Sequence, residues 1–183
     1  VPASISVFSD IQIEDADIRD TVELTRFTPN VHIIESGPQH ALVFRGITSF
    51  DGSIYSPAGF YVDDVNYPLH YMYNIDFFDI ERIEVLKGPQ GTMYGRNTES
   101  GVININTKQP DNELQGKILG EYGNYTNGDF DGYRTGGSVS GPIVRDKLYL
   151  RLAGQWEDSD GFLKNEYNDD DEAGKIEHLN GRG

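Results

Sequence analysis

The stretch IEVLKGPQGTMYGRNTESGVININTK, from Ile83 to Lys108, places two strand-like segments on either side of a glycine-rich turn. The apolar alternation in IEVL and in VININT predicts the two strands. A phosphate-binding loop would need Gly-Lys-Ser/Thr followed by a helix, but this chain has Gly95-Arg96-Asn97 and then a strand. We therefore assign its glycines to turns of positive φ and to close approaches between backbones. They are Gly88, Gly91, Gly95 and Gly101.

Bulk composition excludes several classes of function. The 183 residues are enough for one domain, or for one domain and part of another. The 30 acidic and 15 basic residues give a net charge of −15, which argues against a nucleic-acid partner and fits either cation attraction or a well-solvated surface. Cysteine is absent, so disulfides and thiolate zinc sites are excluded. No signal peptide is visible, and the start at Val1 without Met indicates a mature or excised segment.

The region up to Pro110 mixes strand and helix signals. A single helix is expected from Asp15 to Phe27, capped by Asp15 or Asp17 and followed by Pro29. Short apolar runs separated by Gly, Ser and Pro predict the strands, at residues 3–8, 41–46, 59–65, 79–86 and 102–107. These elements predict a small sheet with short helices and long loops.

The region from Asp111 onward shows strand periodicity only. In KLYLRLAGQWE, Lys147 to Glu157, one parity is apolar and the other largely polar. This length matches the ~9–11 residues of a tilted membrane-spanning strand, whereas a half-buried strand of a soluble sandwich is usually ~5–6 residues long. Trp156 then belongs to an interfacial aromatic girdle, or alternatively to an ordinary core.

Two further segments, 116–125 and 133–143, alternate in the same way, though more weakly. The intervening connections are long at 124–133, short at 142–147 and long again at 157–178, as in outer-membrane barrels with short turns on one side. About three strands would leave open edges, and unpaired edge groups are costly in lipid. The region is therefore expected to be an incomplete part of a barrel.

Several motifs together resemble those of the TonB-dependent outer-membrane receptors. The most specific is IERIEVLKGPQG, residues 80–91, followed by Met93-Tyr94-Gly95 and by GVINI at 101–105. Phe44-Arg45-Gly46 resembles the Arg-Gly strand end of this family. Tyr61-Val62-Asp63-Asp64-Val65 resembles another of its motifs, although Asp64 stands where glycine is usual.

The resemblance implies an α+β plug domain at residues 1–110, with a small mixed sheet, short helices and Gly-rich loops. Residues 111–183 would be the first antiparallel strands of a 22-stranded transmembrane β-barrel in the outer membrane of a Gram-negative bacterium, with the plug inside. It also implies uptake of a scarce nutrient, most often a ferric siderophore, and TonB as a partner through a segment upstream of this chain. On the length of a large barrel, we expect ~400–500 further residues.

The resemblance also suggests candidate site residues. Charged plug side chains are expected to contact the barrel wall, with ordinary surface charge as the alternative: Arg45, Glu81, Arg82, Glu84 and Lys87. Loops 48–58 and 66–74 are expected to face the ligand, because aromatics with polar tips suit a bulky chelate or glycan. Packing within the plug is the alternative for their candidates, Tyr55, Tyr67, His70, Tyr71 and Tyr73.

No catalytic, metal or cofactor site is expected. The 4 histidines lack HExxH spacing, no Gly-x-Ser-x-Gly elbow occurs, and adjacent Asp63 and Asp64 would point to opposite faces of a strand. Acidic runs at 129–132, 158–161 and 169–172 resemble calcium loops in composition but do not complete EF-hand spacing. A soluble, acidic, β-rich binding module of lectin or adhesin type is the main alternative function.

Overall fold

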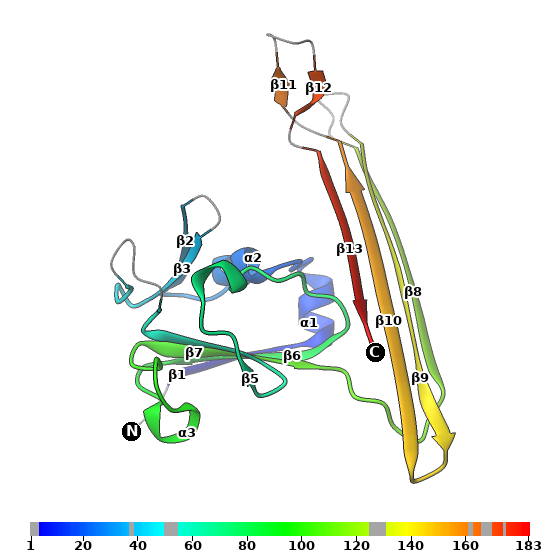
Figure 1. The fold of residues 1–183 in the computed structure, drawn as a ribbon, viewed down its shortest axis with the longest axis horizontal. Coiled ribbons are helices and arrows are strands. Elements are labelled where there is room, and N and C mark those ends of the chain that lie inside the picture. Colours follow the sequence, from blue (N-terminus) through cyan, green and yellow to red (C-terminus); the bar gives the residue numbers. More distant parts are fainter. Residues whose placement is uncertain are drawn as a thin grey trace. The chain divides into compact units, whose positions relative to one another are not determined.

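The computed structural model describes residues 4–36, 39–49, 55–124, 131–160, 163–165, 170–173 and 175–183. The chain forms two compact units, Val1–Lys108 and Gln109–Gly183 (Figure 1). Each unit has its own sheet and is considered by itself.

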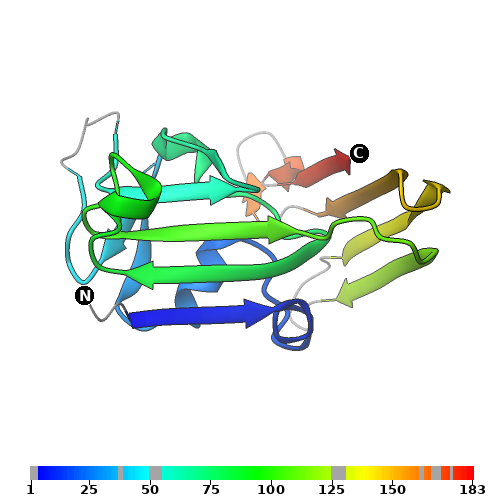
Figure 2. The ribbon, with the colours of Figure 1, turned by 90° about the horizontal axis from the view of Figure 1, so that it is seen from below.

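The first unit is built on a five-stranded mixed sheet with the strand order β1-β6-β7-β4-β5. Neighbouring strands run antiparallel, except that β4 and β7 are parallel. Figure 2 shows β1, β6 and β7 side by side. The strands are β1 (Ser4–Ser9), β4 (Ala58–Val62), β5 (Val65–Asn66), β6 (Ile80–Lys87) and β7 (Gly101–Thr107).

The two faces of this sheet are covered unequally. Helices α1 (Asp10–Asp15) and α2 (Thr21–Arg26) lie on one face, over the main apolar core (Figure 1). The short helix α3 (Gly91–Tyr94) lies on the other face, where Tyr94 packs against a second, smaller cluster (Figure 2). The main core includes Leu24, Phe44, Phe60, Ile83, Ile103 and Ile105, all fully buried.

The single helix expected from Asp15 to Phe27 is wrong, because the chain forms α1 and α2 instead. Ser9 caps α1 in a capping box with Gln12, and Asp20 caps α2 by accepting from the Glu23 N–H at 2.7 Å. Between the helices, Asp17 adopts φ 49°, a left-handed conformation that ends the first helix. Local hydrogen bonding by Ser and Asp side chains therefore decides the boundaries.

A separate two-stranded sheet is formed by β2 (Val31–Ser36) and β3 (Gln39–Phe44), which pair antiparallel. The sequence predicted β3 but not β2. The expected strand over 41–46 ends at Phe44, because Arg45 and Gly46 have φ values of 52° and 82°. The Arg45 N–H donates to the Asn30 carbonyl at 2.8 Å, which holds this turn against the start of β2.

The single strand expected over 59–65 is also wrong, because the chain reverses at Asp63-Asp64. Their φ values of 48° and 65° match a two-residue type I′ turn between β4 and β5, in which both central residues need positive φ. Asp64 therefore adopts the conformation for which glycine is usual. The Asp63 carboxylate accepts from the N–H and the hydroxyl of Thr107, at 2.8 and 2.7 Å. The turn is thereby tied to the last residue of β7.

The glycines of the opening stretch have different physical roles. Gly88 and Gly95 have φ values of 111° and 80°, as expected for turns. Gly101 lies in β7, where a Cβ would collide with the Phe44 ring and lie 2.7 Å from the Leu86 carbonyl oxygen. Gly91 needs glycine for neither reason: its φ is not positive, and a Cβ there would have open space.

The second unit is a four-stranded antiparallel sheet with the order β13-β10-β9-β8. It contains the three predicted strands and a fourth, β13, which sequence reasoning missed. The long loop expected at 157–178 also contains two short strands, β11 and β12, which pair antiparallel. Of the loop expected at 124–133, residues 125–130 lie outside the described part. The strands are β8 (Gln115–Asn124), β9 (Asp131–Val144), β10 (Leu148–Ser159), β11 (Leu163–Asn165), β12 (Asp170–Ala173) and β13 (Ile176–Arg182).

Replacing Gly101 by alanine tests the close contact with Phe44. We expect the free energy of unfolding to fall by about 1–3 kcal/mol, because the added methyl group forces the Phe44 ring and β7 apart. Gly91→Ala is the matched control and should leave it unchanged or raise it by up to about 1 kcal/mol. Chemical denaturation of the purified protein measures both, and equal effects would contradict the packing role of Gly101.

The Asp63-Asp64 turn is tested by two opposite substitutions. Asp63→Ala should lower the free energy of unfolding by about 1–3 kcal/mol, because it leaves the buried Thr107 N–H without its acceptor. Asp64→Gly should raise it by about 1 kcal/mol, since glycine adopts a left-handed φ without steric cost. Thermal unfolding compares the two variants, and a loss of stability in Asp64→Gly would argue against the assigned turn.

Candidate functional site

Two exposed tyrosines lie in the predicted ligand loops. Tyr55 lies in loop 48–58 and forms an isolated β-bridge with Leu69. Tyr71 lies in the 3-10 helix η1 (His70–Met72). Their side chains are 55% and 60% exposed. Both rings are therefore available to a ligand in this conformation.

The other three candidates of these loops face inward. Tyr73 is 1% exposed and stacks on Phe60 with ring centroids 5.3 Å apart, and Tyr67 meets the same ring edge-on at 6.3 Å. His70 is 6% exposed, with its ring centroid 5.7 Å from that of Tyr73. In this conformation the ring of Tyr73 fills the core, which favours the packing alternative, and ligand contact by Tyr73 stays a prediction.

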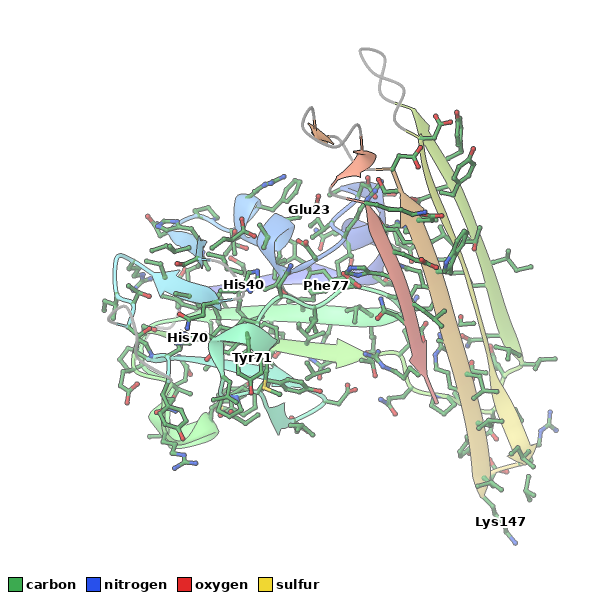
Figure 3. The ribbon with its side chains drawn as sticks, turned by 45° about the horizontal axis from the view of Figure 1, so that its top comes forward. Glu23, His40, His70, Tyr71, Phe77 and Lys147 are labelled. Atoms are coloured by element: carbon green, nitrogen blue, oxygen red, sulfur yellow. The ribbon has the colours of Figure 1, made fainter. Side chains whose placement is uncertain are left out.

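Burial changes the acid–base properties of these inner residues. It raises the pKa of Tyr73 to about 12, although a hydrogen bond with Ser56 acts in the opposite direction. Burial lowers the pKa of His70, and a backbone hydrogen bond with Tyr55 partly offsets this effect. Both side chains are therefore neutral near pH 7. Figure 3 shows His70 and Tyr71 as neighbours on η1.

Sequence reasoning missed Ser49, whose hydroxyl lies 3.2 Å from Nε2 of His70. Nothing in the pattern around Ser49 marks this contact, because the two residues are joined only by the fold. A serine in a Gly/Ser/Pro loop is otherwise read as a turn residue.

Two cationic side chains come from neighbouring strand ends. Arg45 is exposed, and its Nη1 lies 4.0 Å from where a Cβ of Gly88 would stand. Lys87 is the last residue of β6 and is only 7% exposed, although lysine is seldom buried without a partner. Within the described residues, neither side chain has an ion pair.

The other three charged candidates pair with one another. Arg82 contacts Glu81 at 3.1 Å and Glu84 at 2.9 Å, and Glu84 also accepts from the Asn104 amide at 3.5 Å. A register shift between Ile80 and Arg82 makes the strand irregular at this point. The hydrogen bond from Arg82 to Glu84 is the main cause of the raised pKa of Arg82. These side chains have less need of an outside partner than Lys87.

The sheet of the second unit has one apolar and one polar face. Residues that are partners in neighbouring antiparallel strands point to the same face of the sheet. In this register, the apolar residues that alternate along β8, β9, β10 and β13 all lie on one face. The apolar face consists of exposed side chains: Ile118, Tyr122, Tyr133, Val139, Leu150, Leu152, Trp156 and Leu179. The face pattern predicted for the three strands is thus confirmed.

The polar face is held by contacts between strands. Arg134 donates to Glu121 at 2.9 Å, and Arg151 donates to Ser140 at 2.9 Å and to Ser138 at 3.4 Å. A charged pair and hydroxyl partners on one side, with leucines on the other, suit a sheet between an aqueous and an apolar environment.

Aromatic rings gather toward one end of this sheet. Tyr122 and Tyr133 are directly opposite each other, with ring centroids 5.1 Å apart, and Trp156 lies on the same face. The other end carries the short turn between β9 and β10, where Lys147 is exposed (Figure 3). This turn is as short as the sequence predicted.

Neither metal ligands nor helical membrane spans are found in the part of the chain that the structure describes. No group of three or more His, Asp or Glu residues there is arranged to hold a metal ion. No described helix is long and apolar enough to cross a membrane. The acidic runs at 129–132, 158–161 and 169–172 lie partly outside the described residues, so the expectation that they hold no metal is not tested there.

Comparisons with known proteins match this geometry to one family. The family model described as TonB-dependent Receptor Plug Domain matches residues 1–102. The pesticin receptor of Yersinia pestis is 35% identical over 163 residues, covering 86% of this chain and 23% of the receptor. The probable TonB-dependent siderophore receptor PirA of Acinetobacter baumannii is 42% identical over 82 residues, covering 42% of this chain and 10% of PirA.

The likeness extends to a solved structure. The crystal structure of the ferric yersiniabactin uptake receptor FyuA from Yersinia pestis matches with a TM-score of 0.85 and 30% identity, over 98% of this chain and 28% of FyuA. The chain spans about a quarter of the length of these two Yersinia receptors. The mixed sheet with few helices, the charged strand ends and the family match agree, and the chain belongs to the TonB-dependent receptor plug domain family.

Proposed function

We propose that this chain is the plug and the first barrel strands of a TonB-dependent receptor that takes up a ferric siderophore across the outer membrane of a Gram-negative bacterium. The observation that carries the proposal is the likeness to FyuA over 98% of the chain, which includes both units. The plug would occupy residues 1–110 and the barrel strands 111–183, close to the division between the units after Lys108.

The two-faced sheet supports the assignment of the second unit to the barrel. Its exposed leucines, isoleucine and aromatics would face lipid, and the Glu121–Arg134 pair would face the polar interior. Aromatics near one end correspond to an interfacial girdle. The unpaired sides of β8 and β13 would pair with barrel strands outside this chain, because open edges are costly in lipid.

Arg45 and Lys87 are the strongest candidates for contacts between plug and wall. Lys87 is 7% exposed and has no ion pair within the described residues, so a carboxylate on the wall would be a suitable partner for it. Arg45 projects beside Gly88 from a turn held by the Asn30 carbonyl, so its guanidinium is well placed for a second carboxylate. Glu81, Arg82 and Glu84 would contribute less, since they pair among themselves.

Transport by this mechanism requires no covalent chemistry. The ferric siderophore would bind on the exposed Tyr55 and Tyr71 rings. TonB would pull on a segment upstream of this chain and shift the plug from a closed to an open state. The ligand influences this equilibrium only by the difference in its affinity for the two states.

The alternative of a soluble lectin- or adhesin-like module is disfavoured. Soluble monomers seldom expose a continuous apolar face, and the second unit exposes leucines, isoleucine, tryptophan and tyrosines on one face of its sheet. Membership in the receptor family points the same way.

Introducing a lysine on each face of β8 tests the membrane assignment. Ile118→Lys should destabilise the folded full-length receptor in lipid by ~2–4 kcal/mol if the side chain lies near the bilayer midplane. Leu119→Lys, one residue along and on the polar face, is the matched control and should cost much less. The folded fraction in lipid vesicles during urea titration measures both. Equal effects, or a larger effect at Leu119, would contradict a lipid-facing Ile118.

Substituting the two exposed tyrosines tests the ligand assignment. Tyr55→Ala and Tyr71→Ala should each weaken binding of ferric yersiniabactin to the full-length receptor by ~1–3 kcal/mol, since exposed aromatic rings dominate such interfaces. Tyr73→Phe keeps the buried ring and should bind almost as wild type. Fluorescence titration gives the affinities, and growth under iron limitation with this siderophore reports uptake. Undiminished binding in both alanine variants would reject these residues as ligand contacts.

A further inference from the structure

The ring of His70 joins the two segments that carry the exposed tyrosines. Its Nε2 lies 3.2 Å from the Ser49 hydroxyl, and the ring also hydrogen-bonds the backbone of Tyr55. Ser49 and Tyr55 are the described residues on either side of 50–54. The ring therefore contacts the chain both before and after that interval.

The chemistry of a neutral imidazole fits this pair of contacts. Burial lowers the pKa of His70, so the ring carries one proton near pH 7 and offers one donor and one acceptor. The contacts with the Ser49 hydroxyl and the Tyr55 backbone use this donor and this acceptor, and the tautomer sets which ring nitrogen has which role.

The ring is itself fixed to the plug core. It lies 5.7 Å from the Tyr73 ring, which stacks on Phe60 of β4 at 5.3 Å. Tyr71 follows His70 directly in η1, and Leu69 precedes it in the β-bridge with Tyr55 (Figure 3). The two exposed tyrosines are thus both attached to His70: Tyr71 follows it in the chain, and the backbone of Tyr55 hydrogen-bonds its ring.

We propose that His70 is a positioning residue, which holds Tyr55 and Tyr71 as one aromatic pair by tying Ser49 and Tyr55 to η1. The part of this proposal that concerns ligand rests on the function proposed above. Holding both rings in place before binding removes the cost of ordering them when the siderophore arrives. The contacts of His70 with Ser49 and Tyr55 exist in the free plug, so they can be tested without ligand.

The alternative to a positioning role is that His70 only packs in the core, so that its replacement lowers the stability of the fold and has no specific effect on Tyr55 and Tyr71. His70→Phe keeps an apolar ring but removes both hydrogen bonds, and Ser49→Ala removes one of them from the opposite side. His40→Phe is the matched control, because His40 is also partly buried but lies on β3 and pairs with Glu35 at 3.8 Å. Ser49→Thr retains the hydroxyl and serves as the conservative variant.

The experiment uses the full-length receptor and two readouts. Hydrogen exchange of the backbone amides of residues 47–49, 55–56 and 69–72, without ligand, should accelerate about tenfold in His70→Phe and less in Ser49→Ala. Affinity for ferric yersiniabactin should fall about tenfold in His70→Phe. Adding Ser49→Ala to His70→Phe should weaken binding no further, because the two residues share one contact. Ser49→Thr and His40→Phe should leave both quantities near wild type.

Each outcome decides the proposal. Unchanged exchange in His70→Phe overturns it, whatever the ligand does. Faster exchange with undiminished affinity also overturns it, since the tie would then not position the ligand surface. If exchange accelerates as expected but wild type binds neither ferric yersiniabactin nor ferric pyoverdine, the tie is established and the proposed function is what fails. If His40→Phe loses as much affinity as His70→Phe, His70 acts only through packing in the core and the proposal is overturned.

Discussion

The ring of Phe44 lies directly on the backbone of Gly101, and this contact joins the β2–β3 hairpin to one end of the central sheet. Only a residue without a Cβ allows so close an approach. Arg45 follows Phe44 in the chain, and Gly101 pairs with Lys87 across β6 and β7. One packing contact therefore places two cationic residues, far apart in sequence, at the same end of the plug unit.

The second unit is constrained in a different way, because its sheet does not bury its apolar face within itself. Leu150, Leu152 and Trp156 remain exposed on β10, while Arg151 on the opposite face is satisfied by serine hydroxyls. In the proposed receptor, lipid on one side and a polar interior on the other would stabilise this arrangement without a core of its own.

The proposed ligand surface combines a rigid base with exposed rings. Phe60, Tyr73 and His70 form a series of ring contacts from β4 to η1, and Tyr55 and Tyr71 are exposed beside it. Tyrosine suits both roles, since it buries an apolar ring well and presents a polar tip when exposed. The same residue type in one loop region therefore serves either packing or recognition, and neighbouring contacts determine which.

The sequence by itself predicted the strands at 79–86 and 102–107, which form at 80–87 and 101–107, as well as the alternating faces of β8, β9 and β10 and the family, because these depend on local periodicity and on motifs. It did not determine the break between α1 and α2 or the reversal at Asp63-Asp64, where left-handed aspartates and side-chain caps outweigh the apolar pattern. Strand β13 was missed because acidic residues obscure its start. Only the tertiary structure separated buried Tyr73 from exposed Tyr71 and brought Ser49 to His70, since burial and long-range hydrogen bonds depend on which segments the fold places together.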